Sequence, residues 1–153
     1  MSMKKEDKEL LLRDLCSRLP YGVKALCTEI NTKKVYEVEG VCVYHKDVPI
    51  VHLRGQGLIN MPIMYVGPYL FPLSSLTSAQ VGRIQDIMGC NVPWNISNGL
   101  LDWSVGGSVE SEMFELRVEQ IEQLIDFFNS NHIDYLGLIE KSLAIDATGL
   151  NIY

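Results

Sequence analysis

The chain of 153 residues has no long hydrophobic run. A membrane-spanning helix needs roughly 20 consecutive apolar residues, and no stretch approaches that length although 47% of the residues are hydrophobic. The N-terminal stretch is rich in charge and lacks an apolar core, so we expect no secretory signal, no membrane attachment and a cytoplasmic location. In that reducing compartment the four cysteines are expected to be free thiols.

The glycine-rich motifs that bind phosphates are also missing. Neither GxxxxGK[ST] nor GxGxxG occurs in the sequence. Gly55, Gly57 and Gly67 do not form a phosphate loop, because no helix start with a lysine follows them at the required spacing. The sequence therefore argues against the nucleotide-binding folds that depend on these loops.

Basic residues are scarce in the second part of the chain. Residues 55–153 contain three basic and eleven acidic side chains, a charge of −8, whereas residues 1–54 contain ten basic and eight acidic ones, a charge of +2. Binding to a nucleic-acid backbone requires several Lys or Arg contacts. The acidic part makes such binding the weakest hypothesis, and it would rest on four lysines of the N-terminal part, Lys24, Lys33, Lys34 and Lys46.

The periodicity of the apolar residues predicts a helix followed by strands. Leucines at helical spacing indicate a helix over residues 4–19, which Pro20 and Gly22 end. Alternating apolar residues and turn residues then predict a meander of about four strands. We expect these strands over residues 23–30, 34–44, 49–54 and 58–66, and a rigid extended connector over 67–72.

The C-terminal half is predicted to be mainly helical. Thr77 or Ser78 is a candidate N-cap for a helix over 79–88, and residues 115–130 show the strongest helical pattern of the chain. Asp134 is expected to cap a last helix that reaches Ala144, and the tail over 149–153 to be loosely held. Residues 89–115 predict only an irregular or hairpin insertion.

These elements predict a single α+β domain over residues 1–153. We expect a small, bent antiparallel sheet or partial β-barrel, flanked by an N-terminal helix and C-terminal helices, because a short meander must protect its edges. The N-terminal helix would occupy residues 1–20, the β-rich part 21–76 and the mainly helical part 77–153, with the irregular insertion at 89–115.

Metal-binding chemistry finds little support in the sequence. Its Cys/His grouping comprises Cys27, Cys42, His45 and His52. Zinc sites usually pair two ligands in a tight knuckle at each end of the site, and only Cys42 and His45 are close together here. We therefore expect no metal and no cofactor.

Nucleophilic catalysis finds equally little support. It needs a thiol or hydroxyl beside a base and an orienting group. Cys16 is expected on the apolar side of its helix and Cys42 in a strand. Cys90 follows a glycine in a loop and is the most reactive candidate, but no base lies near it in sequence. We expect no catalytic residue and lean toward a protein that is not an enzyme.

Two groups of side chains are candidates for binding. Aromatic residues gather in and before the connector, at Tyr65, Tyr69 and Phe71, and such residues form stacking pockets or interface hot spots. The second group is His132, Asp134 and Tyr135, in which the histidine and the carboxylate could form a pH-sensitive pair. The alternative interpretation of Asp134 is a structural one, as a helix cap.

Three segments stand out, with the sequences DLCSRLPYGV (14–23), PYLFPLSSLT (68–77) and NHIDYLGLIEK (131–141). Together they resemble a group of small uncharacterised proteins of gut Bacteroides-type bacteria and of their phages and prophages. The resemblance implies a phage or prophage origin and no particular reaction. The group usually has basic residues where this chain has Phe71 and Leu136, a departure that argues against an anion site there.

The first function hypothesis is a non-enzymatic binding or interaction protein of phage or prophage origin. Its contacts would lie at the two candidate groups, and it would bind a protein partner or form a homo-oligomer. The second is a protein that binds or sequesters a small, nucleotide-like molecule. The third is a nucleic-acid accessory protein, which the acidic C-terminal part disfavours.

Overall fold

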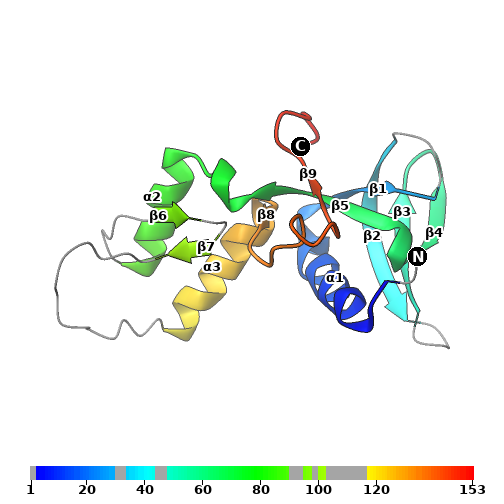
Figure 1. The fold of residues 1–153 in the computed structure, drawn as a ribbon, viewed down its shortest axis with the longest axis horizontal. Helices are drawn as coiled ribbons and strands as arrows, with labels where there is room; N and C mark the ends of the chain where they lie inside the picture. Colours follow the sequence, from blue (N-terminus) through cyan, green and yellow to red (C-terminus); the bar gives the residue numbers. More distant parts are fainter. Residues whose placement is uncertain (1–2, 30–33, 44–47, 90–94, 98–99, 103–116) are drawn as a thin grey trace.

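The computed structural model describes residues 3–29, 34–43, 48–89, 95–97, 100–102 and 117–153 (Figure 1). Its α-helices are α1 (Lys5–Arg18), α2 (Ser78–Met88) and α3 (Val118–Ser130), and its 3-10 turns are η1 (Leu19–Tyr21), η2 (Ile63–Tyr65) and η3 (Leu73–Ser75). Its strands are β1 (Lys24–Cys27), β2 (Val35–Val43), β3 (Pro49–Arg54), β4 (Leu58–Pro62), β5 (Val66–Pro72), β6 (Asn95–Ser97), β7 (Leu100–Asp102), β8 (Ile133–Asp134) and β9 (Ile145–Asp146). The predicted α+β class is confirmed.

The main sheet has seven strands and is open. Six of them lie in the order β4-β3-β2-β1-β5-β8, and β9 pairs with β5 as well. The strands from β1 to β5 pair antiparallel, as the meander predicted, but β8 and β9 run parallel to β5. The sheet is therefore a mixed, open sheet and not a partial barrel.

Helix α1 covers one face of the N-terminal strands. Leu11 and Leu15 of α1 share a fully buried core with Val51 and Leu53 of β3. Because side chains alternate along a strand, the even-numbered residues of β3 lie on the opposite face of the sheet. That outer face is turned away from α1.

Strand β5 connects the β-rich half of the molecule, which contains α1 and β1–β4, to the helical half, which contains α2 and α3 (Figure 1). Its first residues pair with β1, and Phe71 and Pro72 near its end pair with β8. The predicted extended connector is thus a central strand. Leu70, at its middle, is fully buried with Leu138 and Leu143.

The helical half is built from α2 and α3. Thr77 is the N-cap of α2, as predicted, and forms a capping box with Gln80. Ile84 and Met88 of α2 pack with Phe128 of α3. The amide of Gln120 donates to the last carbonyls of α2, at 3.1 and 3.0 Å, and so fixes α3 beside α2.

The predicted last helix is wrong. After β8 the chain forms turns over residues 137–142, in which Gly137 and Ser142 have positive φ angles. Asp134 caps these turns, as its carboxylate accepts hydrogen bonds from the amides of Leu138 and Ile139 at 2.9 and 2.8 Å. Asp134 thus caps as predicted, but it caps turns and not a helix, because the apolar residues at roughly helical spacing here lie in turns.

The structure describes only part of the predicted insertion over residues 89–115. Within that segment, β6 and β7 form an antiparallel hairpin, in line with the predicted insertion, and residues 90–94, 98–99 and 103–115 lie outside the described residues.

Over the described part of the chain, no helix combines the length and apolar character needed to span a membrane.

Candidate functional site

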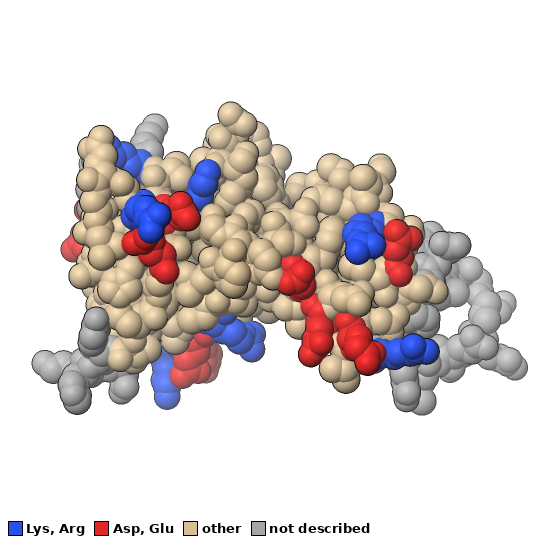
Figure 2. All heavy atoms as spheres, turned by 180° about the vertical axis from the view of Figure 1, so that it is seen from behind, with Lys and Arg blue, Asp and Glu red and all other residues tan. Residues whose placement is uncertain are grey.

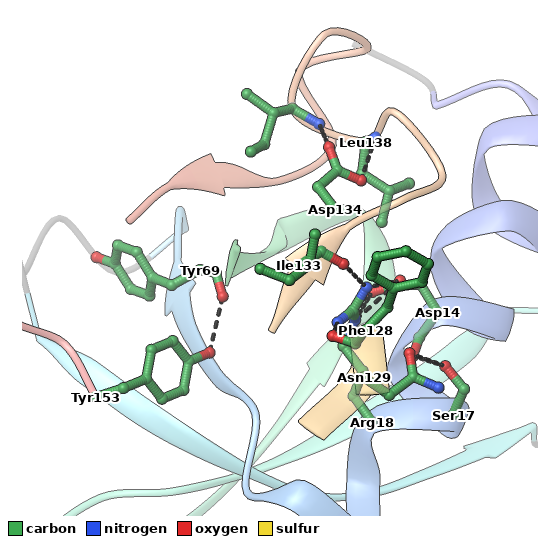
Figure 3. A network of polar contacts seen from close by, with 11 residues as sticks. Asp14, Ser17, Arg18, Tyr69, Phe128, Asn129, Ile133, Asp134, Leu138 and Tyr153 are labelled. Atoms are coloured by element: carbon green, nitrogen blue, oxygen red, sulfur yellow. Dashed lines mark hydrogen bonds and ion pairs between the residues drawn. The ribbon is translucent and has the colours of Figure 1, made fainter. Parts of the chain in front are cut away.

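A buried ion pair joins the two halves of the molecule (Figure 3). Arg18 and Asp14, one turn apart on α1, have no exposed side-chain surface, and their closest atoms lie 2.8 Å apart. The same guanidinium donates to the carbonyls of Phe128 at 3.3 Å and Ile133 at 2.8 Å. Arg18 therefore connects α1 to both the end of α3 and strand β8.

We call this group the polar junction, and it comprises Asp14, Ser17, Arg18, Asn129 and Asp134. Burial raises the pKa of Asp14 above its usual value, although the hydrogen bonds from Arg18 oppose that shift. Ser17 donates to the amide oxygen of Asn129 at 3.4 Å. Asp14, Arg18, Asn129 and Asp134 are buried and Ser17 is half-buried, and each uses a side chain or backbone group of the fold as its partner, so the junction holds the fold together.

The three segments that carry the sequence resemblance meet at this junction. The first supplies Asp14 and Arg18, and the second and third pair with each other through Phe71 with Ile133 and Pro72 with Asp134. Segments far apart in the sequence thus share one structural task. The residues of these segments that pair or bond at the junction therefore have a role in packing the fold.

A hollow of about 520 Å³ lies beside the junction, where β5, α2, the end of α3 and the C-terminal tail meet. Its lining consists of uncharged residues: Phe71, Ser75, Thr77, Gln80, Ser130, Asn131, His132, Ile133, Thr148, Gly149 and Tyr153. A volume of this size suits a small organic molecule. The lining offers two aromatic rings together with hydroxyl and amide groups.

His132 is the distinctive residue of the hollow. Its side chain is only 7% exposed, and within the described part of the chain its Nδ1 atom is buried without a hydrogen-bond partner. Burial lowers the pKa of His132 to about 4, and the positive charges of Arg18 and Lys24 add to this effect. The imidazole is therefore neutral at pH 7 and presents an unsatisfied polar atom, which natural proteins rarely leave unused.

The C-terminal tail is fixed and forms one wall of the hollow, contrary to the loosely held tail that we expected. The ring of Tyr153 stacks on that of His132, with centroids 3.8 Å apart and planes 12° apart. Its hydroxyl donates to the carbonyl of Tyr69 at 2.7 Å (Figure 3). Burial raises the pKa of Tyr153 to about 12. The ammonium of Lys24 also donates to the carbonyl of Ile152, at 2.6 Å.

The structure separates the six predicted binding residues. Phe71 and His132 line the hollow. Tyr69 is buried, and Tyr65 lies in η2 and packs against the core of the β-rich half.

Asp134 and Tyr135 lie apart from that hollow. Both oxygens of the buried Asp134 carboxylate accept backbone hydrogen bonds, and Tyr135 stacks on Phe128 with centroids 5.4 Å apart. They line another hollow of about 760 Å³ together with the exposed Glu140 and Lys141. The smaller hollow is the better candidate, because it holds the buried nitrogen without a partner.

A second cluster lies on the outer face of the sheet, where two members of the Cys/His grouping, Cys42 and His52, meet Asn60, which the sequence analysis did not include. There Cys42 Sγ lies 3.0 Å from His52 Nε2, and His52 Nδ1 lies 2.6 Å from Asn60 Oδ1. We call these three residues the thiol cluster. The signal that could have revealed it is the pairing of adjacent strands, because Asn60 lies opposite His52 in the register of β3 and β4.

The other cysteines and histidines take no part in this cluster. Cys27 is buried in β1, and Cys16 is exposed on α1, whereas we expected it on the apolar side of that helix. His45 and Cys90 lie outside the described residues. No group of three or more His, Cys, Asp or Glu side chains in the described ranges could hold a metal ion.

Comparisons with other proteins give no further guide to these sites. Neither the family models nor the curated proteins nor the solved structures include a match to this chain.

Proposed function

We propose that this chain is a cytoplasmic protein of phage or prophage origin that binds, without chemically changing it, a small, uncharged heteroaromatic molecule. The observation that carries the proposal is a hollow of about 520 Å³ lined by the neutral His132, whose covered Nδ1 has no hydrogen-bond partner among the described residues. A ligand that displaces the groups covering Nδ1 would supply the missing hydrogen bond and so remove the cost of an unsatisfied buried group.

The lining of the hollow supports this class of ligand. Phe71 and Tyr153 offer aromatic surface, with ring centroids 5.9 Å apart, and the amides of Gln80 and Asn131 offer donors and acceptors. No charged side chain lies in the described lining, so a phosphate would lose its hydration without an ion-pair partner in direct contact. A nucleoside therefore fits better than a nucleotide, which narrows the ligand class of the second hypothesis from the sequence.

Thermal unfolding with a panel of nucleosides and their monophosphates tests the proposal. A ligand that binds the folded chain stabilises it by about 2.7 kcal/mol at a hundredfold excess over its Kd. We expect a rise in Tm with at least one nucleoside and a smaller rise with its monophosphate. The rise should disappear in His132→Asn, which keeps a residue type that tolerates the positive φ of 55° at this position.

Arg54→Ala is the matched control, because Arg54 lies on the sheet far from the lining and should leave the rise unchanged. A flat response across the nucleosides would contradict the proposal. A rise that survives in His132→Asn would contradict the assignment of the site.

Helix α3 favours a second candidate function, the binding of a protein partner. Val118, Ile121 and Ile125 lie at helical spacing with 69%, 42% and 41% of their surface exposed. The exposed acids Glu119, Glu122 and Asp126 flank them, and acidic side chains are seen over this helix in Figure 2.

This face fits a basic amphipathic helix of a partner, which would place apolar residues on the stripe and Lys or Arg beside the acids. Size-exclusion chromatography with light scattering tests whether a second copy takes that place. Titration with a labelled basic amphipathic peptide tests the partner, with Ile121→Lys expected to abolish binding and Arg13→Ala on α1 expected to leave it unchanged.

A further inference from the structure

The outer face of the sheet places three functional groups on three neighbouring strands. Cys42 comes from β2, His52 from β3 and Asn60 from β4, and β3 lies between the other two strands. Val51 and Leu53, the neighbours of His52, are fully buried against α1. His52 therefore points to the face that no described helix covers.

A bulge and a glycine set the geometry of this cluster. The register of β2 and β3 shifts between Val38 and Gly40, so that Gly40 lies opposite His52 and Cys42 lies two residues further along. A Cβ atom at Gly40 would lie 3.6 Å from Cδ2 of His52. The imidazole therefore lies across the glycine and reaches the thiol.

The hydrogen bonds define the role of each group. The amide oxygen of Asn60 can only accept, so His52 Nδ1 carries the proton and donates across 2.6 Å. This tautomer leaves the lone pair of Nε2 directed at Cys42 Sγ, which is 3.0 Å away. A nucleophile, a base and a group that orients the base are thus in contact in the order found in the nucleophilic triads of unrelated cysteine hydrolases.

We propose that Cys42, His52 and Asn60 form a nucleophilic triad that accepts an acyl group from a thioester, an activity distinct from the proposed ligand binding. His52 Nε2 takes the thiol proton, and Sγ attacks the thioester carbonyl carbon. A new S–C bond forms, the S–C bond of the donor breaks, and the leaving thiolate receives the proton from His52. One thioester replaces another, so the step needs no oxidant and no other co-reactant.

The open position of the triad favours an activated acyl donor over an amide. Both edges of β3 are paired, with β2 and with β4, so its backbone amides serve the sheet. A tetrahedral intermediate at Cys42 therefore gains no free amide donor from the facing strand β3, and amide cleavage depends strongly on such donors. A thioester has a better leaving group and requires less help. The charged neighbours on this face, Arg54 and Glu39, form an ion pair with each other.

Cysteine reactivity gives the first test, because the chain contains its own control thiols. Cys16 is exposed on α1 without a described base, and its pKa is raised by partial burial. Cys27 is buried. With limiting iodoacetamide at pH 6.5 and peptide-by-peptide mass spectrometry, we expect Cys42 to react about tenfold faster than Cys16, because an unassisted thiol is largely protonated at this pH.

Substitutions then show whether His52 and Asn60 activate the Cys42 thiol or only stabilise the sheet. His52→Gln keeps a polar side chain on the strand and should reduce the rate at Cys42 to that of Cys16. Asn60→Ala should reduce it less, because the imidazole remains but loses its orientation. The rate at the exposed Cys16 should be the same in all variants, and the buried Cys27 should stay unreactive, which shows that the fold is intact. Equal rates at Cys42 and Cys16 in the unmodified protein would overturn the proposal.

Acyl transfer is tested with the acetyl thioester of a small thiol, such as N-acetylcysteamine. We expect the mass of one acetyl group on Cys42 and release of an equal amount of free thiol. Cys42→Ser should show neither, and Cys16→Ser should behave as the unmodified chain. Rapid alkylation of Cys42 without acetylation, or acetylation of Cys16 at the same rate, would overturn the acyl-transfer assignment. Neither result bears on the hollow, since the triad residues do not line it.

Discussion

The polar junction and the thiol cluster are both made of hydrogen-bonded side chains, but they lie in opposite environments. In the junction, Asp14 and Arg18 are completely buried and bond to each other and to two carbonyls. In the thiol cluster, Cys42 and His52 are half-buried and Asn60 is exposed on the outer face of the sheet. The comparison teaches that the same kind of contact is closed to water in one region and accessible to reactants in the other, which is why we place the proposed chemistry at the thiol cluster.

The largest effect on stability is expected when the Arg18 side chain is removed from the junction. Arg18→Met leaves the Asp14 carboxylate buried without its partner, and breaking a buried ion pair in this way costs about 3–5 kcal/mol. The free energy of unfolding from urea denaturation should fall by that amount. Arg13→Met, an exposed change on the same helix, should leave it nearly unchanged.

The double variant Asp14→Leu/Arg18→Met sharpens the result. With both charges removed, most of the lost stability should return, because the larger penalty is the unpaired charge. A single Arg18→Met protein that is as stable as the unmodified chain would show that the junction does not hold the two halves together.

The next effect concerns pH and His132. The pKa is about 6.5 in the unfolded chain and about 4 in the folded one, so between these values only the unfolded chain binds the proton. Stability contributed by the neutral imidazole is complete above pH 6.5 and falls as the pH drops toward 4, by up to about 3 kcal/mol. Denaturation curves at several pH values should show this slope, and His132→Asn should flatten it.

The pKa of Asp14 also differs from its usual value, so the pH dependence of stability has to be compared between the unmodified protein and His132→Asn. Its raised pKa means that the folded chain holds this proton more tightly than the unfolded chain. Its contribution is therefore present at low pH and lost as the pH rises, opposite in sign to that of His132. The difference between the two proteins isolates the histidine, and identical slopes would contradict the burial of His132.

A smaller effect is expected at the tail. Tyr153→Phe removes the hydrogen bond to the Tyr69 carbonyl and should cost about 1 kcal/mol of unfolding free energy. Tyr21→Phe is the matched control, because its hydroxyl bonds to Asp126 at the surface. If both changes had the same effect, the tail would contribute no more than an exposed contact.

The smallest effect is expected on the outer face of the sheet. Asn60→Ala and Arg54→Ala should each change stability by less than about 0.5 kcal/mol, because they remove exposed contacts. Asn60→Ala should nevertheless slow the alkylation of Cys42. A large loss of stability in Asn60→Ala would assign the thiol cluster to the fold and remove the contrast with the junction.

Local elements were predictable where periodicity and capping agree. The leucine spacing placed α1, Thr77 marked the start of α2, and the alternation over residues 34–44 and 49–54 placed β2 and β3. The last helix was mispredicted because Leu136, Ile139 and Leu143 fit a helical spacing, while Gly137 and Ser142 adopt left-handed backbone. Pattern alone does not distinguish buried turns from a buried helix.

The candidate sites were predictable only in part. Phe71 and His132 were chosen because aromatic and titratable side chains often mark sites, and both line the hollow. Gln80 and Asn131 carried no such signal, and Tyr153, although aromatic, lies in the tail over 149–153 that we expected to be loosely held. Cys42 and His52 were grouped only as candidate metal ligands, and their contact with each other and with Asn60 was missed because the three residues come from three strands whose register includes a bulge.

The sequence by itself determined the α+β class, the N-terminal helix, the order of the first strands and the excess of acid in the second part. These properties depend on neighbours within about one helical turn or one strand, so local spacing is enough to specify them. Only the tertiary structure decided that three distant segments meet at Arg18, that the tail covers His132, and that Cys42 contacts His52. Such contacts depend on strand register and on the burial of charge, which no local pattern records.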